Sequence, residues 1–199
     1  LSNLVQLFIF WDLTSFLSYF LISCFHEKES ARKAAFQSLY MTGLGGLSML
    51  AGILLLGSVV DSYSLNDWLA NPEAIKGSSL YLPGLLLILV GVFSKSAQFP
   101  FHFWLPGAMQ APAPVSSYLH SATMVKAGVF LLARLSPVLG GTPEWIYIIS
   151  LIGVLTMLTG SYFAITQTDI KGILAYTTIN ALGVLVLLLG IDTKESIKA

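Results

Sequence analysis

Long apolar stretches, separated by short polar ones, run through nearly all of the 199-residue chain. About 20 apolar residues in a helix span the hydrocarbon core of a bilayer, where a backbone must satisfy its own hydrogen bonds. The pattern therefore predicts an all-α, polytopic membrane protein. We expect one transmembrane domain over residues 1–199, with six helices at residues 3–24, 36–60, 80–106, 115–136, 144–166 and 171–190.

The third expected helix changes character along its length. It is apolar over residues 80–94, and then Lys95, Gln98 and Pro100 follow within the same membrane pass. Proline lacks an amide donor and clashes with the preceding turn, so we expect this helix to be broken near Pro100. Discontinuous helices mark transport sites in many carriers, because irregular backbone at membrane depth must be buried in protein or line a wet cavity. A proline kink that serves packing alone is the other interpretation.

Small residues gather in the second expected helix, at Gly43, Gly45, Gly46 and Gly52. Small residues let the backbones of membrane helices approach closely. Because residues 36–60 contain no charged side chain, we expect these glycines to serve packing alone.

Composition agrees with a membrane protein and excludes several function classes. Hydrophobic residues make up 55% and charged residues only 10%, against roughly a quarter charged in soluble domains. Basic and acidic residues number ten each, so no charge excess indicates nucleic acid as a partner. The single cysteine, Cys24, excludes a Cys-based metal site, and we expect neither a metal nor a cofactor. Because the chain begins inside an apolar run, we expect an internal fragment.

Charges in the loops predict the orientation in the membrane. Lys28, Arg32 and Lys33 lie in the first loop, whereas the next loop carries Lys76 as its only basic residue. Basic residues in short loops favour the cytoplasmic side. We therefore expect the first loop in the cytoplasm and the acidic loop at residues 61–73 outside.

Three ionisable residues lie near the centres of their expected spans: Asp12, Lys95 and Lys126. A charge at this depth costs about 2.5 to 3.5 kcal/mol on insertion scales, so it normally serves a function. Ser15 and Tyr19 continue a polar stripe from Asp12 that should face the interior of the bundle. Lys126 lies too far from either interface for its side chain to reach water comfortably. Lys95 is central if its membrane pass continues beyond the break.

A static ion pair between Asp12 and one of the lysines is one interpretation of these charges. It leaves one cation over, and an unpaired lysine in a low-dielectric environment releases its proton more easily. The three residues therefore indicate a proton relay. His120, one to two turns from Lys126, titrates near neutrality and suits such a relay. A lone histidine among apolar neighbours is more often a packing residue, and only the nearby Lys126 gives the two interpretations equal weight. We expect His102 at the membrane interface.

The stretch FSKSAQFPFHFWLPGAMQAPAPVSSYLHSATMVKAGVFLLARL, residues 93–135, resembles the core of the antiporter-like subunits. This family comprises the large membrane subunits of Mrp-type multisubunit Na⁺/H⁺ antiporters and the proton-pumping subunits of respiratory complex I. WDLTSFLSYFLI, residues 11–22, and DIKGILAYTTINALG, residues 169–183, resemble the family's fifth and tenth helices. The resemblance covers essentially the whole chain and implies part of an inverted-repeat, antiporter-like fold.

The resemblance also implies which residues translocate protons: Asp12, Lys95, His120 and Lys126 match the family's motifs. Asp12 stands where the family usually has glutamate, and its shorter side chain reaches Lys95 less closely. HSATMVKAG around Lys126 and the ending LLLGIDTKESIKA are more similar to the A-type subunits of Mrp antiporters than to complex I.

We therefore expect a proton-translocating subunit of a multisubunit monovalent cation/proton (Na⁺/H⁺) antiporter. It would lie in the cell membrane with other membrane subunits as partners, and whether Na⁺ itself passes through this chain stays open. The alternative is a proton-pumping membrane subunit of complex I, whose electron transfer would occur elsewhere, because the chain has no motif for a redox cofactor. A passive scaffold is a third class, but it would not explain three costly charges at mid-membrane depth.

Overall fold

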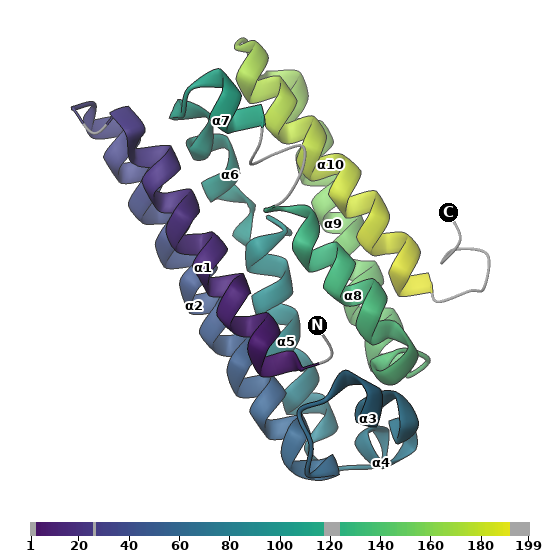
Figure 1. The fold of residues 1–199 in the computed structure, drawn as a ribbon. Helices are drawn as coiled ribbons and strands as arrows, with labels where there is room; N and C mark the ends of the chain where they lie inside the picture. Colours follow the sequence, from purple (N-terminus) through teal and green to yellow (C-terminus); the bar gives the residue numbers. More distant parts are fainter. Residues whose placement is uncertain (1–2, 26, 118–123, 192–199) are drawn as a thin grey trace.

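The computed structural model describes residues 3–25, 27–117 and 124–191. These residues form a bundle of helices that run side by side (Figure 1), and they contain no β-sheet. The all-α membrane fold expected from the sequence is confirmed. The longer helices are α1 (Leu4–Ile22), α2 (Glu29–Val60), α5 (Tyr81–Lys95), α8 (Lys126–Leu139), α9 (Pro143–Thr166) and α10 (Ile170–Ile191).

Four of the described helices, α1, α2, α9 and α10, are long and apolar enough to cross a membrane. Their large apolar side chains point outward: Phe20 on α1 and Ile165 on α9 are exposed, whereas Ser15 and Ser18 of α1 are buried. Apolar residues outside and small polar residues inside are what lipid contact requires of a helix bundle. α2 begins seven residues before the expected 36–60 span, because its charged first turns, with the Lys33–Glu29 ion pair, extend the helix.

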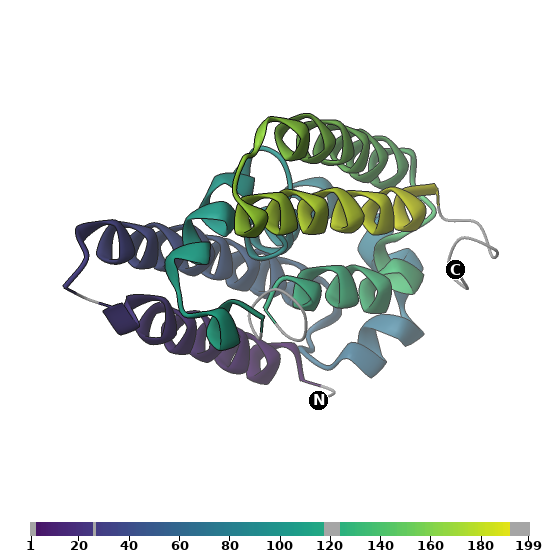
Figure 2. The same cartoon turned by 90° about the horizontal axis from the view of Figure 1, so that it is seen from above.

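Glycines bring the membrane helices into close contact. A Cβ at Gly91 of α5 would lie 2.6 Å from the carbonyl oxygen of Gly45 on α2, and one at Gly52 would lie 2.8 Å from that of Gly84. Backbone therefore meets backbone along the α2–α5 pair. Figure 2 shows α9 and α10 as a second closely packed pair on the other side of the bundle.

The broken helix expected near Pro100 is present. α5 ends at Lys95, Ala97 has a positive φ of 48°, and helical turns resume at η2 (Phe101–Phe103) and α6 (Trp104–Gly107). Protein groups satisfy the backbone that the break releases: the Phe99 amide donates to Thr156 Oγ1 of α9 at 2.9 Å. Ser96, Ala97 and Gln98 at the break are buried in the bundle, whereas Pro100 and Phe103 further along the segment are exposed.

The expected continuous helix at residues 115–136 differs from the structure. The described parts are α7 (Ala113–Ser117), a turn at Met124 and Val125, and α8, which begins at Lys126. Ser96 Oγ, just after α5, donates to the Val125 carbonyl oxygen at 2.7 Å. This hydrogen bond docks the start of α8 on the end of α5, so a second interruption lies beside the first.

Two short helices, α3 (Leu65–Ala70) and α4 (Pro72–Lys76), cover one end of the bundle (Figure 1). Trp68 of α3 is fully buried and its Nε1 donates to the Ser62 carbonyl oxygen at 2.9 Å. The loop between the second and third expected helices is thus a folded cap.

Candidate functional site

Lys95 is the most deeply buried charged side chain of the described residues, with an exposed fraction of 0%. Its Nζ donates three hydrogen bonds of 2.7 Å to α1: one to the carbonyl oxygen of Trp11, one to Thr14 Oγ1 and one to Ser15 Oγ. Nζ also lies 5.2 Å from the centroid of the Trp11 ring, within the range of a cation–π contact. A lysine ammonium has three donors, so every one has a partner.

The sequence of α1 places these three partners on one side of the helix. Residues three and four apart in a helix share a face, so Thr14 and Ser15 both lie next to the turn of Trp11. Thr14 Oγ1 donates to the Trp11 carbonyl oxygen at 2.7 Å while it accepts from Lys95. The hydroxyls of Thr14 and Ser15 and the Trp11 carbonyl form a polar cradle for Lys95, which we call the α1 cradle.

Asp12 lies beside the α1 cradle but forms no direct ion pair with Lys95 in the described structure. Its charge is still close enough to interact with that of Lys95. Asp12 is partly buried, its Oδ1 is buried without a hydrogen-bond partner, and the carboxylate lies against Gly46 of α2. Gly46 therefore packs against a charged side chain of α1, a contact that the sequence does not reveal.

Lys126 occupies a different position from the one expected. Sequence reasoning placed it at the centre of a continuous helix, but it is the first residue of α8 and its side chain is exposed in this chain. His120, the fourth expected relay residue, lies outside the described residues.

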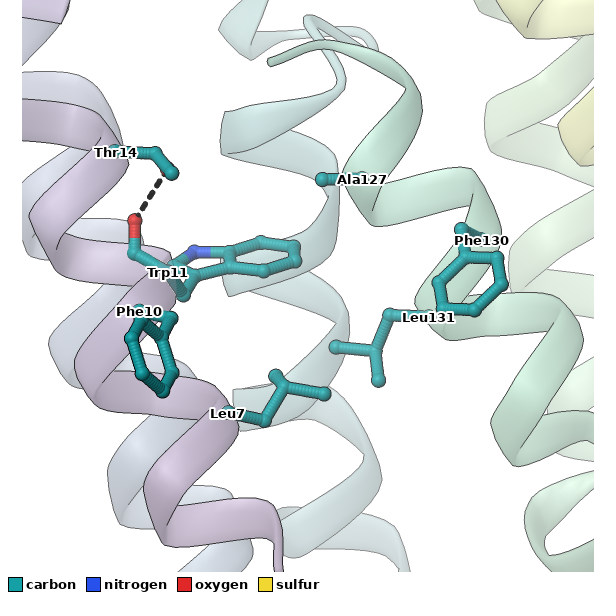
Figure 3. Close-up of a pocket in the computed structure, with 7 residues that line it drawn as sticks. All are labelled: Leu7, Phe10, Trp11, Thr14, Ala127, Phe130 and Leu131. Atoms are coloured by element: carbon teal, nitrogen blue, oxygen red, sulfur yellow. Dashed lines mark hydrogen bonds between the residues drawn. The ribbon is translucent and has the colours of Figure 1, made fainter. Parts of the chain in front are cut away.

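A cavity of about 200 Å³ separates α1 from the start of α8. Figure 3 shows Trp11 and Thr14 on one wall and Ala127, the neighbour of Lys126, on the other. The lining is almost entirely apolar, and it includes Trp11 and Thr14, two residues of the α1 cradle. The cavity therefore lies between the surroundings of Lys95 and the α8 turn that carries Lys126.

His102, expected at the interface, lies within the broken segment and is partly buried. Its ring stacks between Phe99 and Phe163 of α9, with centroid distances of 6.1 and 6.2 Å, and its Nδ1 has no partner. It is thus a packed aromatic residue next to the break in this chain.

Sequence reasoning missed Thr14 and Gly46. Thr14 could have been found from the helical spacing of Trp11, Thr14 and Ser15, which gathers two hydroxyls on one turn. Gly46 carries no such signal, because only the packing of α1 on α2 shows which glycine faces Asp12.

A family model described as "NADH:quinone oxidoreductase/Mrp antiporter, TM" matches residues 2–199. The chain belongs to this family. The resemblance to antiporter-like subunits is thereby confirmed, and the chain is a multi-pass membrane segment of the NADH:quinone oxidoreductase/Mrp antiporter family.

Relatives within this family include two bacterial antiporter subunits. The chain is 53% identical over 192 residues to a probable K⁺/H⁺ antiporter A/B subunit of Rhizobium meliloti, covering 96% of this chain and 19% of the relative. It is 47% identical over 191 residues to the Na⁺/H⁺ antiporter A subunit of Bacillus subtilis, covering 96% and 24%. The chain thus spans about a fifth to a quarter of the length of these relatives.

A solved structure supports the same assignment. The Mrp complex from Dietzia sp. DQ12-45-1b contains a chain that is 37% identical and superimposes with a TM-score of 0.87, covering 98% of this chain and 21% of that one. The helix arrangement described above is therefore that of a membrane subunit in the NADH:quinone oxidoreductase/Mrp antiporter family.

Proposed function

We propose that this chain is part of a proton-translocating subunit of a multisubunit monovalent cation/proton antiporter, and that Lys95 carries the proton. The observation that carries the proposal is the fully buried Lys95 with its three hydrogen bonds to α1. Burial of an amine inside a membrane bundle has a free-energy cost, so such an amine normally serves a function. A lysine is able to gain and lose one proton. The antiporter names of the relatives support the same function.

The α1 cradle is suited to both protonation states of Lys95. The charged form donates to the Trp11 carbonyl and to the hydroxyls of Thr14 and Ser15. The neutral amine has two donors and one acceptor lone pair, and a hydroxyl that rotates donates to that lone pair. When Lys95 releases its proton, Thr14 or Ser15 therefore changes from acceptor to donor without movement of the helix.

The proton would move between Lys95 and Lys126 through the cavity between α1 and α8. Thr14 belongs to both the cradle and the cavity lining. The cavity of about 200 Å³ is large enough for water, but its lining is almost entirely apolar, so in this proposal water enters it only transiently to pass the proton. In this proposal Lys126 and His120 continue the relay, and Asp12 adjusts how readily Lys95 holds its proton.

The exchanged ion would be a monovalent cation, because the antiporter relatives are named for K⁺ in one case and Na⁺ in another. Other membrane subunits would complete the transport path in the cell membrane. The family description also covers NADH:quinone oxidoreductase, so a proton-pumping subunit of complex I is the second candidate. Proton exchange driven by a cation gradient alone, without an electron donor, favours the antiporter.

The test uses membrane vesicles that carry the complete complex. Lys95→Ala and Lys126→Ala should each abolish the pH change driven by a cation gradient. Lys95→Arg keeps the positive charge but does not release a proton near neutral pH, so it should assemble and still fail to exchange. Lys33→Ala is the control, because Lys33 has a 76% exposed side chain in a surface ion pair and should be dispensable. Exchange at the wild-type rate in Lys95→Arg would show that the charge is structural.

A further inference from the structure

One glycine of α2 makes room for a charged side chain. A Cβ added at Gly46 would overlap Asp12 Oδ1 and would lie 3.6 Å from Cδ1 of the Trp11 ring. The neighbouring glycines are different: Gly45 faces Ser94 of α5, and Gly43 has nothing within 4 Å. The backbone at Gly46 therefore forms the floor of a small recess for the Asp12 carboxylate, which we call the Gly46 notch.

Hydrogen bonding does not hold the carboxylate oxygen in this notch. Asp12 Oδ1 is buried there and has no hydrogen-bond partner. Burial of an unpartnered charged oxygen is unfavourable, so the space left by the missing side chain of Gly46 is what permits this position. A helical residue has few allowed χ1 rotamers, so a carboxylate expelled from the notch must move as a whole to another one.

The geometry points to Gly46 as a positioning residue: its missing side chain sets where the Asp12 carboxylate lies, and so how strongly Asp12 favours a charge on Lys95. The inference rests on the proposed function, in which Lys95 carries the proton. Sequence alone suggests only close helix packing for this glycine, whereas the structure assigns it an electrostatic role at the neighbouring helix.

Asp12 is the acidic neighbour through which this effect would act on Lys95. If the separation of the two charges changes from about 6 to about 4 Å, at an effective dielectric constant near 20, the pH at which Lys95 releases its proton changes by roughly one unit. The remaining titratable side chains on the helices around this pair are Tyr19 of α1, Glu29, Arg32, Lys33 and Tyr40 of α2, Tyr81 of α5, and Lys126 and Arg134 of α8.

Gly46→Ala tests the inference in membrane vesicles that carry the complete complex. The pH profile of cation-driven proton exchange should shift by about half to one pH unit, because the added methyl group expels the carboxylate from the notch. Gly43→Ala is the matched control on the same helix, since its methyl group enters open space, and its profile should be that of the wild type. An unshifted profile in Gly46→Ala would overturn the inference.

A double-mutant cycle with Asp12→Ala separates this role from packing. Once the carboxylate is removed, Gly46→Ala should shift neither the pH profile nor the Tm of the purified complex. If Gly46→Ala alone impairs assembly, the double variant should restore it, because the methyl group then fills the space that the carboxylate leaves. An effect of the same size with and without Asp12 would make Gly46 a packing residue and overturn the inference.

The two measurements also distinguish this inference from the proposed function. The Tm of the complex reports the contact between positions 12 and 46 without any transport. The Tm values could show coupling between Gly46→Ala and Asp12→Ala while the pH profile of exchange stays the same in every variant. That result would leave the placement of Asp12 intact. It would overturn the tuning of Lys95 by Asp12, whereas failure of the proposed function itself would show as wild-type exchange in Lys95→Arg.

Discussion

Lys95 Nζ donates a 2.7 Å hydrogen bond to Thr14 Oγ1, although the two residues lie 81 positions apart in the chain. This bond joins the end of a broken helix to the polar face of α1. Thr14, like Trp11, both contacts the buried lysine and lines the cavity between α1 and α8. The first prediction therefore concerns this hydroxyl.

Thr14→Val keeps the shape of the side chain and removes the acceptor. A hydrogen bond to a charged group contributes roughly 1.5 to 3 kcal/mol, and each 1.36 kcal/mol corresponds to about one pH unit. The charged form of Lys95 loses this support, so exchange should slow and its pH optimum should fall by about one unit. Thr177→Val is the control, because Thr177 is exposed on α10 and bonds only within its own helix. Equal profiles for the two variants would rule out a role for the Thr14 hydroxyl.

Asp12→Asn should lower the pH optimum of exchange, because it removes a negative charge that favours the protonated lysine. Two charges about 4 Å apart interact by roughly 4 kcal/mol at an effective dielectric constant near 20, and less at a larger distance. Since Asp12 makes no direct ion pair with Lys95, we expect a fall of about one to two pH units. Asp12→Glu has a longer reach and should keep activity or raise the optimum. Unchanged exchange in Asp12→Asn would leave Asp12 as a structural residue.

The orientation is tested by cysteine labelling after Cys24, which is exposed, has been replaced by serine. Ser30→Cys, in the exposed first turns of α2, should react with an impermeant thiol reagent only from the cytoplasm. Asn66→Cys, exposed on α3, should react in intact cells. Asn66 is a better reporter for this loop than Ser62, because Ser62 is partly buried and donates a hydrogen bond to Asp67. Labelling of Ser30→Cys in intact cells would show that the first loop lies outside the cell, opposite to the predicted orientation.

Ser96→Ala should loosen the contact between the end of α5 and the start of α8. Ser96 is fully buried and its hydroxyl donates to the Val125 carbonyl oxygen at 2.7 Å. Loss of this bond should cost about 1 kcal/mol or somewhat more and lower the Tm of the complex. Ser58→Ala is the control, since the Ser58 hydroxyl is exposed and bonds to Leu55 in its own helix. A Tm equal to that of the control would show that other contacts hold α8 in place.

The apolar pattern predicted the membrane helices and the break near Pro100, because lipid demands long apolar segments and proline interrupts them. The burial of Lys95 followed from its place in the chain only on the condition that its membrane pass continues beyond the break. The position of Lys126 could not be predicted from the local sequence. Its helix begins where Ser96, the residue just after α5, donates a hydrogen bond to the Val125 carbonyl oxygen. The contact of Gly46 with Asp12 is likewise a product of tertiary packing, which no local pattern contains.

The two interruptions of the bundle place two lysines at opposite poles of their helices. Lys95 is the last residue of α5 and Lys126 is the first residue of α8. The aligned peptide dipoles of a helix give its C-terminus a partial negative charge and its N-terminus a partial positive one. The field of α5 therefore attracts a cation at Lys95, while that of α8 repels one at Lys126. In the proposed relay, the peptide dipoles of the two helices would therefore favour transfer of a proton from Lys126 toward Lys95.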